Sequence, residues 1–158
     1  QNGADVTAVV GRAERAEGLA ELGAADVVVG TLPLEGDDFT LVLESVGGDS
    51  LAAALARVAP DGTVVSFGNS SGERTTFDPT AFYRKPGARL YAFVIFPELR
   101  RSRSATADLR YLANLVAVGH LDVGIDRVVD WADVGAVRSA MADLLARKVN
   151  GKAVISLL

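Results

Sequence analysis

The chain has 158 residues, a formal net charge of −4 and no cysteine, which excludes disulfides, thiolate catalysis and cysteine-rich zinc sites. Its 49% hydrophobic and 23% charged residues are typical of a globular protein, and its acidic balance is the opposite of a nucleic-acid footprint. No apolar run approaches the roughly 20 residues of a membrane span, and a single histidine, His120, argues against a metal site. We therefore expect a cytoplasmic protein that binds neither nucleic acid nor membrane and holds no metal in this chain.

The first third of the chain alternates β-branched runs with apolar residues at helical spacing. The elements predicted there are strands at Asp5–Val10, Asp26–Val29 and Phe39–Leu43, a helix at Arg12–Leu22, a loop at Thr31–Gly36, and a helix at Leu51–Val58. The helix at Leu51–Val58 follows a glycine turn in which Asp49 or Ser50 can cap it.

The same alternation continues to the end of the chain. The elements predicted there are a turn at Ala59–Gly62, a strand at Thr63–Phe67, a helical turn at Pro79–Arg84, a strand at Leu90–Phe96, a helix at Ser104–Val118, a strand at Ile125–Val129, a helix at Trp131–Lys148 and a strand at Lys152–Leu157. Strands that alternate with helices predict an α/β fold with a doubly wound, parallel, Rossmann-like sheet. Ligands of such sheets bind outside the carboxyl ends of the strands, which makes Glu44–Gly48 the first candidate site.

Four short segments, taken in their order, carry a family resemblance. They are Glu21–Ala24, Glu44–Gly48, Pro60–Gly68 and Asn150–Val154. Together they resemble the cofactor-binding half of the medium-chain dehydrogenase/reductase family, which includes zinc-type alcohol dehydrogenases and zinc-free quinone oxidoreductases. The resemblance runs from one end of the chain to the other.

The resemblance also implies what this sequence lacks. A family member has a first strand and a G-x-G-x-x-G turn that holds the cofactor pyrophosphate, and Gln1–Ala4 resembles the tail of the helix that follows them. We therefore expect residues 1–118 to form a partial NAD(P)-binding Rossmann domain, with 119–158 returning to an N-terminal catalytic domain outside this sequence. In the strand order 3-2-1-4-5-6, the absent strand lies between Asp5–Val10 and Phe39–Leu43.

The residues after the first visible strand bear on the choice of cofactor. Gly11, Arg12 and Arg15 stand where such folds read the adenosine ribose, and no acid is present there to bind the ribose hydroxyls of NAD. Two arginines three residues apart can face one phosphate, which favours NADPH over NADH. The alternative is that both arginines are simply solvated.

The resemblance implies further cofactor contacts at three other strand ends. They involve Ser45, Val46, Gly47, Gly68, Asn69 and Ser70, which would line the ribose and nicotinamide, and Val94 and Ile95, whose backbone would lie near the carboxamide. The alternative is that the first six form ordinary turns and that the side chains of Val94 and Ile95 belong to the core.

Two functions from different classes remain open. The first is an NADPH-dependent oxidoreductase that transfers hydride to a quinone, enone or related carbonyl substrate. The second is a non-catalytic module that binds a dinucleotide or a partner subunit. The resemblance implies that substrate identity, zinc content and the proton donor depend on a domain outside this sequence, and the catalytic residues stay unknown.

The run Leu90–Phe96 predicts a homodimer. It has no charge and strong β propensity, and the predicted strand order places it at the outer edge of the sheet. Pairing with its own copy about a two-fold axis would satisfy the exposed backbone groups. Alternatively, a loop or the helix at Ser104–Val118 covers this edge within one subunit.

Overall fold

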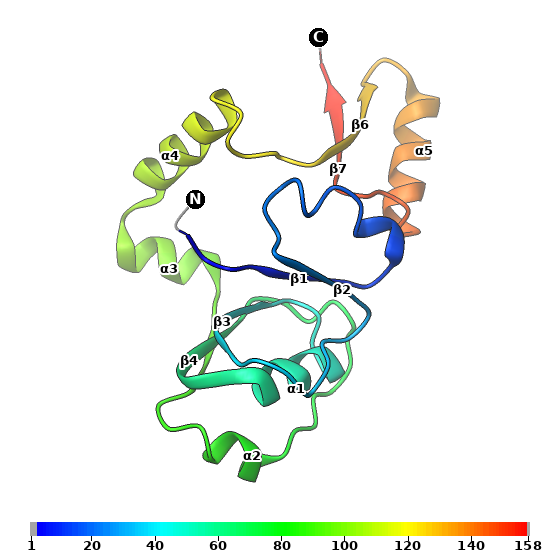
Figure 1. Cartoon of the computed structure of the whole chain (residues 1–158). Helices are drawn as coiled ribbons and strands as arrows, with labels where there is room; N and C mark the ends of the chain where they lie inside the picture. Colours follow the sequence, from blue (N-terminus) through cyan, green and yellow to red (C-terminus); the bar gives the residue numbers. More distant parts are fainter. Residues whose placement is uncertain (1–2, 158) are drawn as a thin grey trace. The chain divides into compact units, whose positions relative to one another are not determined.

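A computed structural model describes residues 3–157 and divides the chain into two compact units, Gln1–Arg103 and Ser104–Leu158 (Figure 1). The expectation that the chain starts in the tail of a helix rests partly on Gln1 and Asn2, which lie outside the described residues. All strand pairs of residues 3–157 are parallel. The predicted α/β class with parallel sheets is therefore confirmed.

The first unit contains two sheets. β1 (Thr7–Val10) pairs with β2 (Asp26–Val29), and β3 (Phe39–Glu44), β4 (Val58–Ser66) and β5 (Arg89–Ala92) form a sheet in the order β3-β4-β5. Within residues 3–157, β1 and β3 belong to different sheets. This interruption falls at the position that the strand order 3-2-1-4-5-6 gives to the missing strand.

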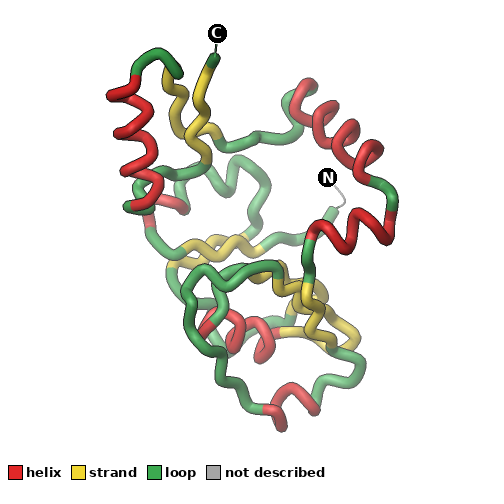
Figure 2. The backbone as a smooth tube through the Cα atoms, turned by 180° about the vertical axis from the view of Figure 1, so that it is seen from behind, coloured by secondary structure: helices red, strands yellow, loops and turns green. Residues whose placement is uncertain are grey.

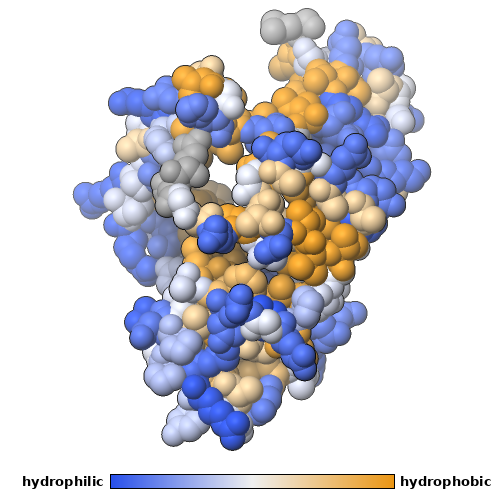
Figure 3. All heavy atoms as spheres, viewed as in Figure 1, coloured by the Kyte–Doolittle hydropathy of each residue, from blue (hydrophilic) through white to orange (hydrophobic). Residues whose placement is uncertain are grey.

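Helix α1 (Gly48–Arg57) covers one face of the β3-β4-β5 sheet. Its Ala54 and Leu55 pack on Val58 and Val64 of β4, and all four are at most 2% exposed. Burying a valine or leucine side chain contributes roughly 1.5–3 kcal/mol, so this cluster is the main apolar core of the unit. Large hydrophobic side chains remain exposed in both units, and Figure 3 shows apolar area on the face in view.

Arg57, the last residue of α1, holds the connection between β2 and β3. Its Nη1 donates to the carbonyl oxygens of Pro33 (2.6 Å) and Glu35 (2.7 Å), and its Nε and Nη2 donate to the carbonyl oxygen of Asp37. The guanidinium also lies 5.1 Å from the centre of the Phe39 ring. Because Arg57 is only 5% exposed, these carbonyls take the place of the water that its charge has lost.

The helix predicted over Arg12–Leu22 is wrong. Only a short 3₁₀ helix, η1 (Ala13–Arg15), forms there, and a series of turns leads to β2. Gly18 has a φ of 76°, in the left-handed region, which interrupts the right-handed helical path. The apolar spacing around it was helical, but the backbone at Gly18 is not.

The strand predicted over Leu90–Phe96 is too long. β5 ends at Ala92, just as its neighbour β4 ends at Ser66, and helix α3 (Ile95–Ser102) follows. Pro97, which directly follows the predicted strand, lies in the first turn of α3, where a helix tolerates proline because that amide needs no partner. Arginines in the last turn suit the carboxyl end of the helix dipole.

Smaller differences concern element boundaries. α1 begins at Gly48, earlier than the predicted Leu51, and the predicted turn Ala59–Gly62 is an irregularity inside β4, where the register with β3 shifts. The helical turn at Pro79 is confirmed as α2 (Pro79–Tyr83), with Asp78 as its N-cap. β4 therefore begins before the residues that the sequence assigns to a turn and includes them.

The second unit has two helices and one parallel strand pair (Figure 2). It contains α4 (Ala105–Ala117), β6 (Ile125–Asp130), α5 (Val134–Leu145) and β7 (Lys152–Ser156), with β6 paired to β7. Arg127 of β6 donates to Asp143 of α5 at 2.8 Å, and this hydrogen bond lowers the pKa of the Asp143 carboxyl.

The predicted return of residues 119–158 to a catalytic domain stays a prediction. Within residues 3–157, no helix combines the length and apolar character needed to cross a membrane.

We expect Arg57→Met to lower the free energy of unfolding by about 2 to 4 kcal/mol. The substitution removes the charge-assisted hydrogen bonds to the carbonyl oxygens of Pro33, Glu35 and Asp37. Arg57→Lys should cause an intermediate loss, since one ammonium group cannot span them. Urea denaturation measures both. The exposed Arg138→Met is the matched control and should change stability by less than about 0.5 kcal/mol; an Arg57→Met variant that behaves like this control contradicts the role of Arg57.

The predicted homodimer stays a prediction, and the structure sharpens its test. β5 is the edge strand of its sheet, and Leu90, in mid-strand, is 49% exposed. We expect Leu90→Lys to give monomers or aggregates, because a charge would be placed in the paired edge. Light scattering measures the mass. Tyr83→Lys, at a side chain 85% exposed on α2, is the control; an unchanged mass of the Leu90→Lys variant would show that any interface lies elsewhere.

Candidate functional site

The carboxyl ends of β3 and β4 carry two loops that lie side by side. β3 and β4 are parallel and end together at the pair Glu44 and Ser66, so both chains leave the sheet at the same edge. The amides of Phe67, Ser70 and Ser71 donate to the carbonyl oxygens of Glu44 (2.9 Å), Ser45 (3.0 Å) and Val46 (2.9 Å). Backbone hydrogen bonds therefore join the two loops beyond the end of the sheet.

Glu44 organises the turn that leads from β3 into α1. Its carboxylate, in a side chain that is 4% exposed, accepts hydrogen bonds from the amides of Val46 (2.8 Å) and Gly47 (3.2 Å). The predicted caps at Asp49 or Ser50 are wrong: the N-cap of α1 is Gly47, which has no side chain to cap with. A negative charge beside the amino end of α1 also suits the helix dipole.

Glycine is required where the two loops meet. A Cβ on Gly68 would lie 2.9 Å from the carbonyl oxygen of Ser45, a contact that side chains do not make. Gly47 has a φ of 79°, which other residues rarely adopt. The close approach of the loops therefore depends on the absence of side chains at both positions.

The structure brings together six of the predicted cofactor-binding residues: Ser45, Val46, Gly47, Gly68, Asn69 and Ser70. Val46 is 43% exposed, and Asn69 and Ser70 are exposed, so these loops present both side chains and backbone to a ligand. Ser71 was missed. Its hydroxyl donates to Asn69 Oδ1 (3.3 Å) and accepts from the Glu73 amide (3.1 Å), and nothing in the polar loop sequence distinguished it from its neighbours.

Gly11, Arg12 and Arg15 lie at the carboxyl end of β1, in the other sheet of the unit. Arg12 is the N-cap residue of η1 and is exposed, whereas Arg15 is half-buried. Nε of Arg15 is buried and has no hydrogen-bond partner among the described residues. A buried donor without a partner is unfavourable by about 1–3 kcal/mol.

The side chains of Val94 and Ile95 do not belong to the core, contrary to the alternative given by the sequence. Val94 is the N-cap of α3 and is 57% exposed, and Ile95 is its first residue and is 47% exposed. They follow β5 at the same edge of the sheet as the two loops. Their side chains are therefore accessible rather than part of the core.

A side-chain network that sequence analysis missed joins β5 to α3 beside these residues. The Tyr91 hydroxyl donates to Glu98, and Nη1 of Arg101 lies 3.2 Å from both the Tyr91 hydroxyl and Glu98 Oε1. The hydrogen bond to the Glu98 carboxylate raises the pKa of Tyr91. No sequence spacing indicates that Arg101 of α3 contacts Tyr91 of β5.

The described residues contain no group of three or more histidine, cysteine, aspartate and glutamate side chains that could hold a metal ion. The candidate site is instead a set of loops with small and polar residues at adjacent strand ends. An open parallel sheet with such loops at its carboxyl edge is the architecture of a Rossmann-type dinucleotide-binding domain.

Comparison with known families makes this assignment specific. The model of the zinc-binding dehydrogenase family matches residues 9–155, almost the whole chain, so the protein belongs to this family. This agrees with the resemblance found in the sequence. No curated protein matches the chain.

Solved structures agree with this assignment. A mycobacterial quinone oxidoreductase is 25% identical with a TM-score of 0.79, over 97% of this chain and 49% of its own. A mycobacterial protein in complex with NADPH is 25% identical with a TM-score of 0.77, over 97% and 50%. A Bacillus subtilis protein with NAD bound, 23% identical over 98% and 47% with a TM-score of 0.68, supports the fold alone. The chain spans about half the length of these proteins.

We expect Gly68→Ala to lower the free energy of unfolding by about 1–3 kcal/mol, because its Cβ would collide with the Ser45 carbonyl and push the loops apart. Thermal or urea denaturation measures the change. Gly11→Ala is the matched control, since a Cβ on Gly11 would meet no atom within 4 Å and Gly11 has no positive φ, so stability should change by less than about 0.5 kcal/mol. Equal stability of the two variants would contradict a close approach at Gly68.

Proposed function

We propose that this chain is the cofactor-binding part of an NADPH-dependent oxidoreductase that transfers hydride to a quinone, enone or related carbonyl substrate. The observation that carries the proposal is the pair of loops, joined by backbone hydrogen bonds, at the carboxyl ends of β3 and β4. Family membership and the similarity to a quinone oxidoreductase support the same class of reaction. The bound nicotinamide supplies the hydride, and the protein supplies binding and orientation.

The residues present fit such a cofactor. Val46 and Gly68–Ser70 are exposed and Ser45 is half-buried, so hydroxyl and amide groups on small side chains can make close contact with a ribose. The carboxylate of Glu44 fixes the first of these loops before any ligand arrives, because it binds two of its amides. A loop that is already ordered loses little conformational entropy when it binds.

The preference for NADPH rests on Arg12 and Arg15. Arg12 is exposed and Arg15 is half-buried, and their guanidinium groups can donate charge-assisted hydrogen bonds to a ribose phosphate. The similar structures contain NADPH in one case and NAD in another, so the choice between the two cofactors is part of the proposal. A cytoplasmic location, expected from the sequence, likewise stays a prediction.

The second candidate function is a non-catalytic dinucleotide-binding or subunit-interaction module. It requires only the paired loops at the ends of β3 and β4, which lie within the described residues. The two candidates differ in one measurement: a catalytic protein oxidises NADPH in the presence of a quinone such as menadione, whereas a module binds NADPH without turnover.

We expect the protein to bind NADPH more tightly than NADH, and the double variant Arg12→Ala/Arg15→Ala to lose this preference. Charge-assisted hydrogen bonds of about 1.5–3 kcal/mol each correspond to at least a tenfold change in the affinity ratio. Fluorescence titration with both cofactors measures it. The control is Arg110→Ala/Arg138→Ala, which removes the same charge from the second unit and should leave the ratio unchanged. If the first double variant also leaves it unchanged, the two arginines do not read the ribose phosphate.

A further inference from the structure

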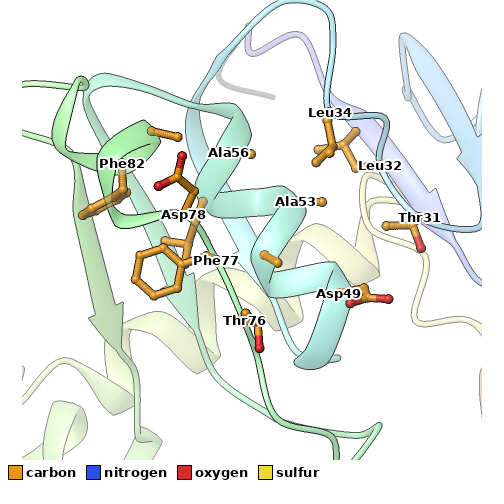
Figure 4. A pocket seen from close by; sticks show the side chains of 13 residues that line it. Thr31, Leu32, Leu34, Asp49, Ala53, Ala56, Thr76, Phe77, Asp78 and Phe82 are labelled. Carbon is orange, nitrogen blue, oxygen red and sulfur yellow. The ribbon is translucent and has the colours of Figure 1, made fainter.

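A groove with a volume of about 420 Å³ lies over α1 in the first unit and shares no residue with the candidate cofactor loops (Figure 4). Its floor is the outer side of α1, where Ala52, Ala53 and Ala56 present only methyl groups. One wall comes from the connection after β2 and the other from the segment that contains α2. A cavity of this size, lined mainly by apolar groups, is typical of small-molecule sites.

The groove is open because the connection between β2 and β3 contains no helix. The chain runs from Gly30 to Asp38 without a helix, between strands of two different sheets. Thr31, Leu32 and Leu34 of this connection line the groove, and Leu34 is 68% exposed. Arg57 fixes the wall, since it binds the carbonyls on both sides of Leu34.

The opposite wall is aromatic. Phe77 and Phe82 line the groove and contact each other edge to face, with ring centres 6.1 Å apart and an interplanar angle of 81°. Figure 4 shows them across α1 from Leu32 and Leu34. A rigid aromatic pair offers both an apolar surface and ring faces that attract cations.

The polar groups of the groove are acidic. Asp49, in the first turn of α1, and Asp78 contribute carboxylates, and none of the lining residues is lysine, arginine or histidine. Asp78 Oδ1 caps α2 by accepting from the Thr80 amide at 2.8 Å, which fixes the carboxylate at the wall. The hydroxyl-bearing Thr31 and Thr76 complete the polar lining.

We propose that this groove binds a small hydrophobic ammonium ion, such as an arylalkylamine in its protonated form. The apolar body lies on the alanine floor between Leu34 and the phenylalanine pair, and the ammonium group faces Asp78, which lies beside the two rings (Figure 4). Asp49, at the other end of α1, adds to the negative charge of the groove. The two carboxylates and the ring faces select a cation over a neutral or anionic molecule of the same shape. The limited volume favours a small molecule over an amphipathic helix of a partner protein.

The proposal is tested with three probes of similar shape and different charge: phenethylammonium, 2-phenylethanol and phenylacetate. Titration calorimetry, or amide chemical shifts of the labelled protein, gives the affinities. We expect phenethylammonium to bind tightest and phenylacetate weakest. Equal affinity of the three probes, or tighter binding of phenylacetate, overturns the proposal.

Three variants locate the site. Asp78→Asn removes the facing charge at constant shape, and asparagine still caps α2; it should weaken phenethylammonium about two- to fivefold and leave 2-phenylethanol unchanged. Asp49→Asn, at the other end of α1, should weaken phenethylammonium less. Ala56→Phe should fill the groove and abolish binding of every probe. Because the asparagine variants preserve side-chain volume, they keep the test valid if Ala56→Phe does not fold.

The matched control is Glu21→Gln, which removes one negative charge from an exposed position that does not line the groove. It should leave all three affinities unchanged. If it weakens phenethylammonium as much as Asp78→Asn does, the protein attracts the cation through its net charge, and the proposal is wrong. A basic amphipathic peptide that binds where phenethylammonium does not would identify a docking surface for protein instead, and would also overturn it.

Discussion

The parallel pairing of β3 with β4, closed on one face by α1, is the interaction on which the rest of the first unit depends. Val58 and Val64 are fully buried under α1, and this contact fixes the helix to the strand pair. The strands end opposite each other, so their loops leave the sheet as neighbours. The core and the candidate site therefore depend on the same strand pair. Apolar packing under α1 holds β3 and β4 in the register that places their two loops side by side.

Glu44 connects that core to the surface. Its carboxylate is almost fully buried, yet it satisfies amides of the exposed turn that begins α1. A buried charge is tolerated only where such hydrogen bonds replace water. The turn therefore has its shape without a ligand, and the groups presented by Ser45 and Val46 are in place beforehand.

The sequence predicted the strands better than the helices and the contacts. Apolar runs bounded by glycine or proline located β2 and β3 closely, because burial of a strand demands that pattern. The helical spacing at 12–22 was misleading, since one left-handed glycine, Gly18, outweighs several well-placed apolar residues. The start of α3 was not predicted, because a proline such as Pro97 usually indicates the end of an element but is also accepted in the first turn of a helix.

The candidate site was predictable in part. Residues at strand ends could be placed because parallel strands share one carboxyl edge, which is a property of the topology rather than of any side chain. The partners of Arg57, Arg101 and Ser71 could not. Two of these contacts cross between elements, and the partners of Arg57 are carbonyl groups, which every residue carries.

The way Arg57 holds its loop has a consequence for sequence variation. The guanidinium recognises the main chain at Pro33, Glu35 and Asp37 and not their side chains. Related sequences can therefore change the side chains of Glu35 and Asp37 freely without losing the clamp, whereas the arginine itself and the left-handed Gly36, with a φ of 121°, are constrained. In an alignment of relatives, we therefore expect an invariant arginine at position 57 together with variable side chains at positions 35 and 37.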